Sequence, residues 1–202
     1  MEYQPKINPD NERFEQRSEQ GHREQVPRIY VASLSDYNEG RLHGVWLDAA
    51  QDVDTLESVV TAMLSDSATP GAEEYAIHDF ENFGPLRLGE HESLATVSKV
   101  ALGITEHGPG FAYYASLVGT DDLERLDRFE DAYFGHFDSL EEYAASVVDD
   151  LGYFDVIDRS IPESFRPYVS FDVGLFAHDL EISGDVAVSE GDGGVYLFNG
   201  HE

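Results

Sequence analysis

Apolar and polar positions follow two different periods along the chain, and these predict a mixture of strands and helices. Strand-like runs cover residues 29–34, 45–47 and 75–80, with a polar loop at 36–44 between the first two. Between the second and third runs, apolar residues recur at the i, i+3, i+4, i+7 spacing of a half-buried helix. Residues 28–86 are therefore predicted to form an N-terminal α+β unit. The helix positions are Leu56, Val59, Val60, Met63 and Leu64.

The middle of the chain keeps the helical period. Apolar positions predict one helix over residues 93–104, which stops near Gly108, and another over 111–118. A third helix is predicted from Asp121 to Tyr133, with acids opposite its apolar side at i, i+3, i+7. Such neighbours would stand roughly 5 to 6 Å apart along a helix axis. Residues 87–134 are predicted to form a helical middle unit, whose acidic row contains Glu124, Asp127 and Asp131.

The last part returns to a mixture of helix and strand. Ser139 and Glu142 have the spacing of a capping box ahead of an apolar helical face that runs to Leu151. A helix around 171–180 follows, and then two strands at 186–189 and 195–198 joined by a glycine-rich hairpin loop. Residues 135–202 therefore form a predicted C-terminal α+β unit. Residues 1–27 are polar without apolar periodicity, and this predicts a disordered N-terminal arm.

Three predicted helix starts resemble one another, at residues 52–56, 90–94 and 136–140. Each has a carboxylate, then a Ser or Thr that is interpreted as the N-cap (Thr55, Ser93, Ser139), and then a core Leu. Helix capping explains each start locally, since acids are favourable near the positive end of a helix dipole. The recurrence also places carboxylates at the starts of successive helices.

Charge changes this picture, because the chain holds 41 acidic and 12 basic residues. Residues 29–202 contain 7 of the basic and 35 of the acidic residues, a net charge of −28. Acidity with few Lys fits solubility or a high-salt environment; alternatively, the negative field is itself the function, because nucleic-acid-binding proteins have grooves built for a polyanion. At one charge per about 1.7 Å of duplex, a net charge of −28 corresponds to roughly 48 Å of DNA.

Enzyme signatures are missing from the sequence, which has no P-loop, dinucleotide-binding turn or nucleophile elbow. No Cys is present, so thiolate metal sites and Cys nucleophiles are excluded. His78-Asp79 and Glu90-His91-Glu92 contain metal-ligand residue types, but adjacent side chains point apart. The acids near Asp36 and Asp52 do not follow a calcium-loop pattern. We therefore expect no enzymatic activity, no cofactor and no metal.

Apolar runs are too short for a membrane span, and the N-terminus lacks the apolar core of a signal peptide. The expected location is the cytoplasm.

Several segments together resemble a known family, the ArdA-type antirestriction proteins of plasmids, phages and conjugative transposons. The segments are RIYVASL (28–34), DYNEGRLHGVW (36–46), EEYAIHDFE (73–81), AYFG (132–135), SLEEYA (139–144), GD (184–185) and GVYLF (194–198). The resemblance implies an elongated, curved homodimer with three small units in each chain. Its acidic surface would mimic bent DNA and occupy the DNA-binding groove of type I restriction-modification enzymes, at their specificity and methyltransferase core. Cleavage, and with it methylation in some cases, would be inhibited, and DNA of an incoming mobile genetic element would be protected.

The family's antirestriction motif is similar to residues 88–97, where the matching positions are Leu88, Glu90, Glu92, Ser93, Leu94 and Val97. Ala95 and Thr96 stand where acids are common in the family, and Lys99 follows. An acidic binding module for another basic, DNA-binding partner is the alternative hypothesis, and a small enzyme is the third. The predicted DNA-mimic surface consists of Asp52, Asp54, Glu57, Glu73, Glu74, Glu90, Glu92, Asp121, Asp122, Glu124, Asp127, Glu130, Asp131, Asp138, Glu141, Glu142, Asp149 and Asp150.

Overall fold

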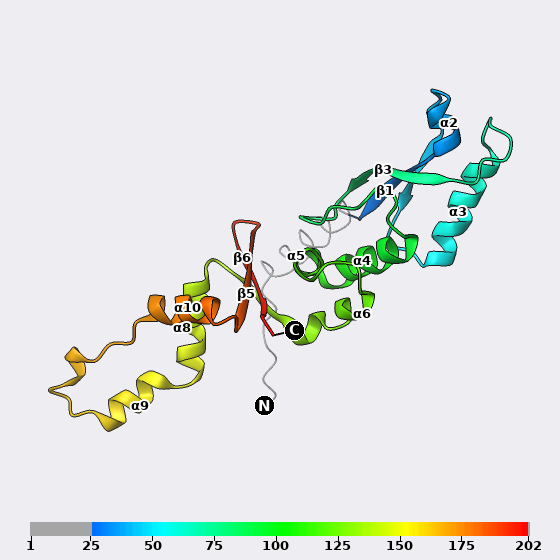
Figure 1. Cartoon of the computed structure of the whole chain (residues 1–202). Coiled ribbons are helices and arrows are strands. Elements are labelled where there is room, and N and C mark those ends of the chain that lie inside the picture. The colour runs from blue at the N-terminus through cyan, green and yellow to red at the C-terminus, as the bar shows by residue number, and fades with distance from the viewer. Residues whose placement is uncertain (1–25, 202) are drawn as a thin grey trace, which may run out of the picture. The chain divides into compact units, whose positions relative to one another are not determined.

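The chain folds as an α+β protein, as the sequence predicts. The computed structural model describes residues 26–201, and in this range the chain divides between Ala112 and Tyr113 into two compact units (Figure 1). Each unit contains a three-stranded antiparallel sheet that is accompanied by helices.

The first sheet has the order β2-β1-β3, so β1 (Arg28–Ser33) lies between β2 (Gly44–Asp48) and β3 (Tyr75–Glu81). All three predicted strands are confirmed. Residues 34–38 differ from the prediction, because they form a short helix, α2 (Leu34–Asn38), instead of a strand end and a loop. The hydroxyl of Ser33 accepts a hydrogen bond from the amide of Asp36 and starts this turn.

Helix α3 (Val53–Ser65) packs against β1, β2 and helix α4 (Leu94–His107). Both helices were predicted from their apolar faces, and Leu56 and Val97 of those faces are buried. Gly108 ends α4 with a φ of 77°, a value that glycine adopts without steric cost. Because α4 packs on α3, the first compact unit continues past residue 86, where the sequence suggested a boundary. The division into three units stays a prediction.

The prediction of one helix over residues 121–133 is wrong. After α5 (Pro109–Val118), the chain forms two four-residue helices, α6 (Leu123–Leu126) and α7 (Phe129–Ala132). The amide of Asp127 bonds back to Glu124 and Arg125, in a tight turn that ends α6. Tyr133 then enters a strand that was not predicted, β4 (Tyr133–Phe137). Its ring lies 4.9 Å from Phe129 and 5.6 Å from Phe198, so aromatic packing decides its conformation.

The second sheet has the order β4-β6-β5. Its central strand is β6 (Gly194–Asn199), which forms the predicted hairpin with β5 (Val186–Gly191). Asp192 and Gly193 make the turn with φ values of 53° and 80°, the positive pair that a type I′ turn requires.

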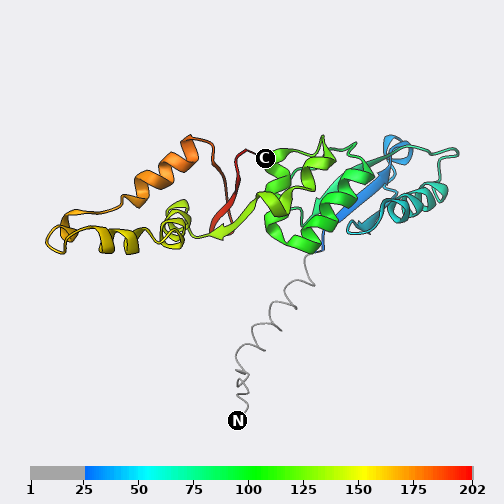
Figure 2. The same cartoon turned by 90° about the horizontal axis from the view of Figure 1, so that it is seen from below.

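Two helices of the second unit were predicted and are confirmed, α8 (Leu140–Asp150) and α10 (Val173–Ile182). They pack together and share a buried cluster with the hairpin strands. Between them lie α9 (Tyr153–Ser160), which the sequence analysis did not predict, and a single 3₁₀ turn, η1 (Arg166–Tyr168). Figure 2 shows this connecting segment extending away from the β5-β6 hairpin. The buried cluster contains Leu140, Ala144, Ala177, Val186 and Leu197.

Candidate acidic surface

The carboxylates of the predicted DNA-mimic surface lie on the outside of the two units. All of them are exposed except Glu92, which is half-buried. Asp52, Asp54 and Glu57 occupy the start of α3, and Glu73 and Glu74 directly precede β3. In the second unit, the acids from Asp121 to Asp131 surround the short helices α6 and α7, and those from Asp138 to Asp150 lie on or beside α8. The structure therefore makes these side chains accessible to a partner.

The acidic row Glu124, Asp127 and Asp131 does not follow one helix axis. Glu124 belongs to α6, Asp127 ends that helix, and Asp131 belongs to α7. The axial spacing that the sequence analysis derived from a continuous helix was therefore wrong for this segment. The carboxylates remain exposed, but their arrangement depends on two short helices and the turn that joins them.

Side-chain caps fix the starts of α3, α4 and α8, the three helices whose starts resemble one another in sequence. Ser93 and Ser139 are N-caps as predicted, and they accept hydrogen bonds from the amides of Thr96 and Glu142. For α3 the prediction of Thr55 was wrong, because Asp52 is the N-cap and accepts from the amide and the hydroxyl of Thr55. These bonds, with the hydroxyl as the largest cause, lower the pKa of Asp52. A carboxylate at this position also interacts favourably with the helix dipole.

The predicted capping box at α8 has a shifted form. Glu142 accepts a hydrogen bond from the amide of Asp138, 2.8 Å away, instead of from the amide of the N-cap Ser139. Two backbone donors, that of Asp138 ahead of the helix and that of Glu142 in its first turn, are thus satisfied by side chains.

The segment that resembles the antirestriction motif divides between core and surface. Leu94 and Val97 are buried, Leu88 is half-buried, and Ser93 caps α4. Glu90 is exposed, while its carbonyl accepts a hydrogen bond from the amide of Ile77 in β3.

The remaining positions of this segment also differ in their burial. The carboxylate of Glu92 accepts a hydrogen bond from the amide of Ser93. Thr96 is buried against the Ser93 hydroxyl, whereas Ala95 is exposed. Of Ala95 and Thr96, therefore, only Ala95 faces solvent.

Basic side chains are few, and several of them are neutralised by nearby acids. Arg28 lies 3.9 Å from Glu81, and Arg159 lies 3.5 Å from Asp155. Arg166 pairs with Asp158 at 3.5 Å. These contacts reduce the positive field at the surface and leave the excess negative charge dominant.

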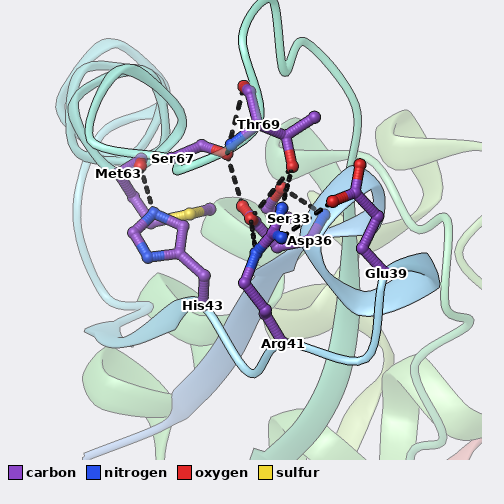
Figure 3. A network of polar contacts seen from close by, with 8 residues as sticks. All are labelled: Ser33, Asp36, Glu39, Arg41, His43, Met63, Ser67 and Thr69. Carbon is purple, nitrogen blue, oxygen red and sulfur yellow. Dashed lines mark hydrogen bonds and ion pairs between the residues drawn. The ribbon is translucent and has the colours of Figure 1, made fainter.

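Sequence reasoning missed a buried carboxylate, Asp36, which is 0% exposed (Figure 3). Its oxygens accept hydrogen bonds from Arg41, Ser67 and Thr69. The Ser67 hydroxyl is the largest cause that lowers the pKa of Asp36, against the opposing effect of burial. Sequence reasoning placed Asp36 in a polar loop and rejected it as part of a calcium loop; its two hydroxyl partners, which lie 31 and 33 residues away, could not be foreseen. The segment DYNEGR in the family resemblance was the available signal.

A cluster of Ser183, Asp185 and His201 contains the residue types of a hydrolase triad, in an arrangement unsuited to nucleophilic catalysis. Asp185 lies in the middle and accepts hydrogen bonds from Ser183 at 2.6 Å and from His201 at 2.9 Å. These bonds, that from Ser183 first, lower the pKa of Asp185. A catalytic serine needs the imidazole beside its own hydroxyl, so this cluster serves to close the turn before β5.

In the described part of the chain, metal-ligand side chains do not form a metal site either. Within residues 26–201, no group of three or more His, Cys, Asp or Glu side chains has the arrangement of a metal site. His78 and Glu90 do approach each other, at 3.9 Å, and Tyr37 packs edge-on against His78.

The second unit also exposes an apolar face, which we call the α9 face. Leu151 is 75% exposed, Tyr168 84% and Ile182 67%, and no residue of α9 is buried. A pocket of about 310 Å³ opens beside them. Of these three side chains, Leu151 lines the pocket, and exposed apolar surface of this kind is typical of interaction sites. The pocket is lined by Val148, Leu151, Tyr153, Val156, Phe171 and Phe176.

Among the described residues, no helix has the length and apolar character to span a membrane.

Most of the chain is similar to one family of known proteins. A family model described as antirestriction protein (ArdA) matches residues 29–194. No curated protein matches the chain.

Proposed function

The chain belongs to the ArdA family of antirestriction proteins, and from this premise we propose that it inhibits type I restriction-modification enzymes by presenting its surface in place of DNA. The observation that carries the proposal is the exposure of the acidic side chains on both compact units. A groove that binds duplex DNA is lined by cations arranged for closely spaced phosphates, so a protein with surplus carboxylates can compete for it.

Family membership supports the choice of target. We propose that the chain binds the specificity and methyltransferase core, where the enzyme holds its DNA, and that cleavage of an incoming mobile element is thereby prevented. Inhibition would take place in the cytoplasm, where such an enzyme meets incoming DNA. No chemistry by the protein itself is required, because the enzyme is blocked by occupancy alone.

We also propose that the protein acts as a homodimer, with the α9 face as the contact between two copies. This face exposes large apolar side chains, and the adjoining pocket offers space for side chains of a second copy. Burial of apolar surface stabilises association by about 25 cal/mol per Å² before the costs of binding are subtracted. A dimer would double the length of acidic surface that is available to the target.

The proposal can be tested by measuring DNA cleavage by a purified type I enzyme in the presence of increasing amounts of this protein. We expect complete inhibition at low ionic strength and weaker inhibition as salt rises. Unchanged cleavage with a molar excess of protein in low salt would contradict the proposal. Equal inhibition of an unrelated basic DNA-binding protein would instead favour a general acidic binding module.

A further inference from the structure

Asp36 lies where two loops of the first unit meet. It belongs to α2, between the end of β1 and the start of β2, and its partners come from the loop between α3 and β3. We call Ser33, Asp36, Arg41, Ser67 and Thr69 the Asp36 cluster (Figure 3).

The bonds of the Asp36 cluster connect two loops. From the loop after α2, Arg41 donates through Nε to Oδ1 of Asp36 at 3.0 Å. From the loop after α3, the Thr69 hydroxyl donates to the same oxygen at 3.1 Å, and the Ser67 hydroxyl donates to Oδ2. Arg41 also donates directly to the Thr69 hydroxyl, which closes the connection between the loops.

A fully buried carboxylate is costly unless donors surround it. Here a guanidinium and two hydroxyls supply these donors, and no buried side-chain polar atom of the described residues lacks a hydrogen-bond partner. Loss of one donor would leave charge without compensation, so the two loops are held in one arrangement by the same carboxylate.

Exposed acids stand on the two connected loops. Glu39 pairs with Arg41 at 2.7 Å, so the cluster holds one of these acids through its cation. Glu73 and Glu74 stand on the other loop, where the carbonyl of Glu74 accepts a hydrogen bond from the amide of Leu34. The cluster thus holds the side chain of Glu39 through Arg41, and a neighbouring backbone bond ties Glu74 to the start of α2.

We propose that Asp36 is a positioning residue for inhibition: its buried carboxylate joins the two loops and sets the spacing of the exposed acids Glu39, Glu73 and Glu74 for the basic groove of the target enzyme. This inference rests on the proposed function. It adds that part of the acidic surface acts through fixed geometry at short range, and not only through its total charge.

The test compares two variants that each remove one carboxylate from the first unit. Asp36→Asn removes the buried carboxylate of the cluster, and Glu57→Gln removes an exposed one on α3. Thr69→Val is a third variant, which keeps every charge and removes one donor to Asp36. Inhibition of the purified type I enzyme is measured well below the unfolding midpoint of each variant, at several salt concentrations, with amide hydrogen exchange recorded for residues 39–43 and 66–74.

We expect Asp36→Asn and Thr69→Val to weaken inhibition about tenfold at 0.15 M salt, where the Debye length is about 8 Å and short-range fit matters. The loss should shrink to about twofold at 0.01 M salt, because long-range attraction then dominates. Faster exchange should be confined to the two loops. Glu57→Gln should weaken inhibition less than about twofold at every salt concentration.

Three results would overturn the inference. If both cluster variants inhibit as well as Glu57→Gln at 0.15 M salt, the proposed function survives and the positioning role of Asp36 is wrong. Equal losses at low and high salt, with faster exchange throughout the unit, would indicate a general loss of stability. If the unaltered chain does not inhibit the enzyme, the proposed function and the inference both fail.

Discussion

The first unit and the α9 segment of the second unit differ in how far their apolar side chains are buried. In the first unit, α3 and α4 bury their apolar faces, and even the carboxylate of Asp36 is enclosed by donors. In the segment from Leu151 to Ile182, apolar side chains remain exposed and α9 buries none of its residues. The first unit therefore stabilises α3 and α4 through its own core, whereas the α9 segment leaves most of its large apolar side chains in contact with solvent.

The largest expected effect concerns the core of the first unit. Leu56→Ala should lower the free energy of unfolding by about 2–5 kcal/mol, because it leaves a cavity under α3. Leu151→Ala removes the same atoms from an exposed position and should change that free energy by less than about 0.5 kcal/mol at protein concentrations that favour the monomer. Urea denaturation measures both, and equal losses would contradict the comparison.

The next effect concerns association. Leu151→Asp places a charge in the α9 face, and we expect it to weaken self-association at least about tenfold, since a charge cannot be buried without a partner. Leu42→Asp is the matched control, because Leu42 is also highly exposed but lies in the first unit. Sedimentation velocity over a concentration series measures the change. An unaltered chain that stays monomeric at high concentration would rule out the α9 face as a dimer contact.

A smaller effect concerns how the stability contributed by Asp36 depends on pH. This dependence distinguishes the buried carboxylate from the exposed acids. The folded state lowers the pKa of Asp36, so the carboxylate contributes stability above its unfolded pKa of about 3.9, and this contribution is lost as pH falls below that value. The difference in unfolding free energy between the unaltered chain and Asp36→Asn should therefore be constant from pH 7 to pH 5 and decrease from pH 4 to pH 3. Chemical denaturation at each pH measures it, and a difference that grows on acidification would show that the sign is wrong.

The smallest effect is expected from single exposed acids. Glu141→Gln on α8 should change inhibition less than about twofold, because one charge in a distributed field contributes little. Several such substitutions should add up gradually in a cleavage assay. Abolition of inhibition by one of them would indicate a local site instead of a distributed surface.

Local patterns predicted most of the regular elements. The strand-like apolar run at residues 29–34, the helical face of α3 and the Asp192-Gly193 turn each carry enough local information to specify their structure. Exposure of the predicted acids also follows from their position opposite apolar faces.

The errors occurred where distant residues decide the conformation. Tyr133 has the helical spacing of a core residue, but packing against Phe198 draws it into a strand. The cationic partner of Asp36 is Arg41, five residues later in the chain. Its hydroxyl donors come from a loop about thirty residues later. Helix α9 contacts α8, and its Tyr153 packs on Phe171, but the helix buries none of its residues. The sequence analysis overlooked its short apolar face, which contains Tyr153, Val156 and Ile157.

Direct competition tests the central claim most sharply. A labelled duplex that carries the recognition sequence is bound to a purified type I methyltransferase core at low ionic strength, and the protein is then titrated into the complex. The account predicts complete release of the duplex at a near-stoichiometric amount of protein, with more protein required as salt is raised. A complex that holds both the duplex and the protein, or a duplex that stays bound at large excess of protein, would contradict it.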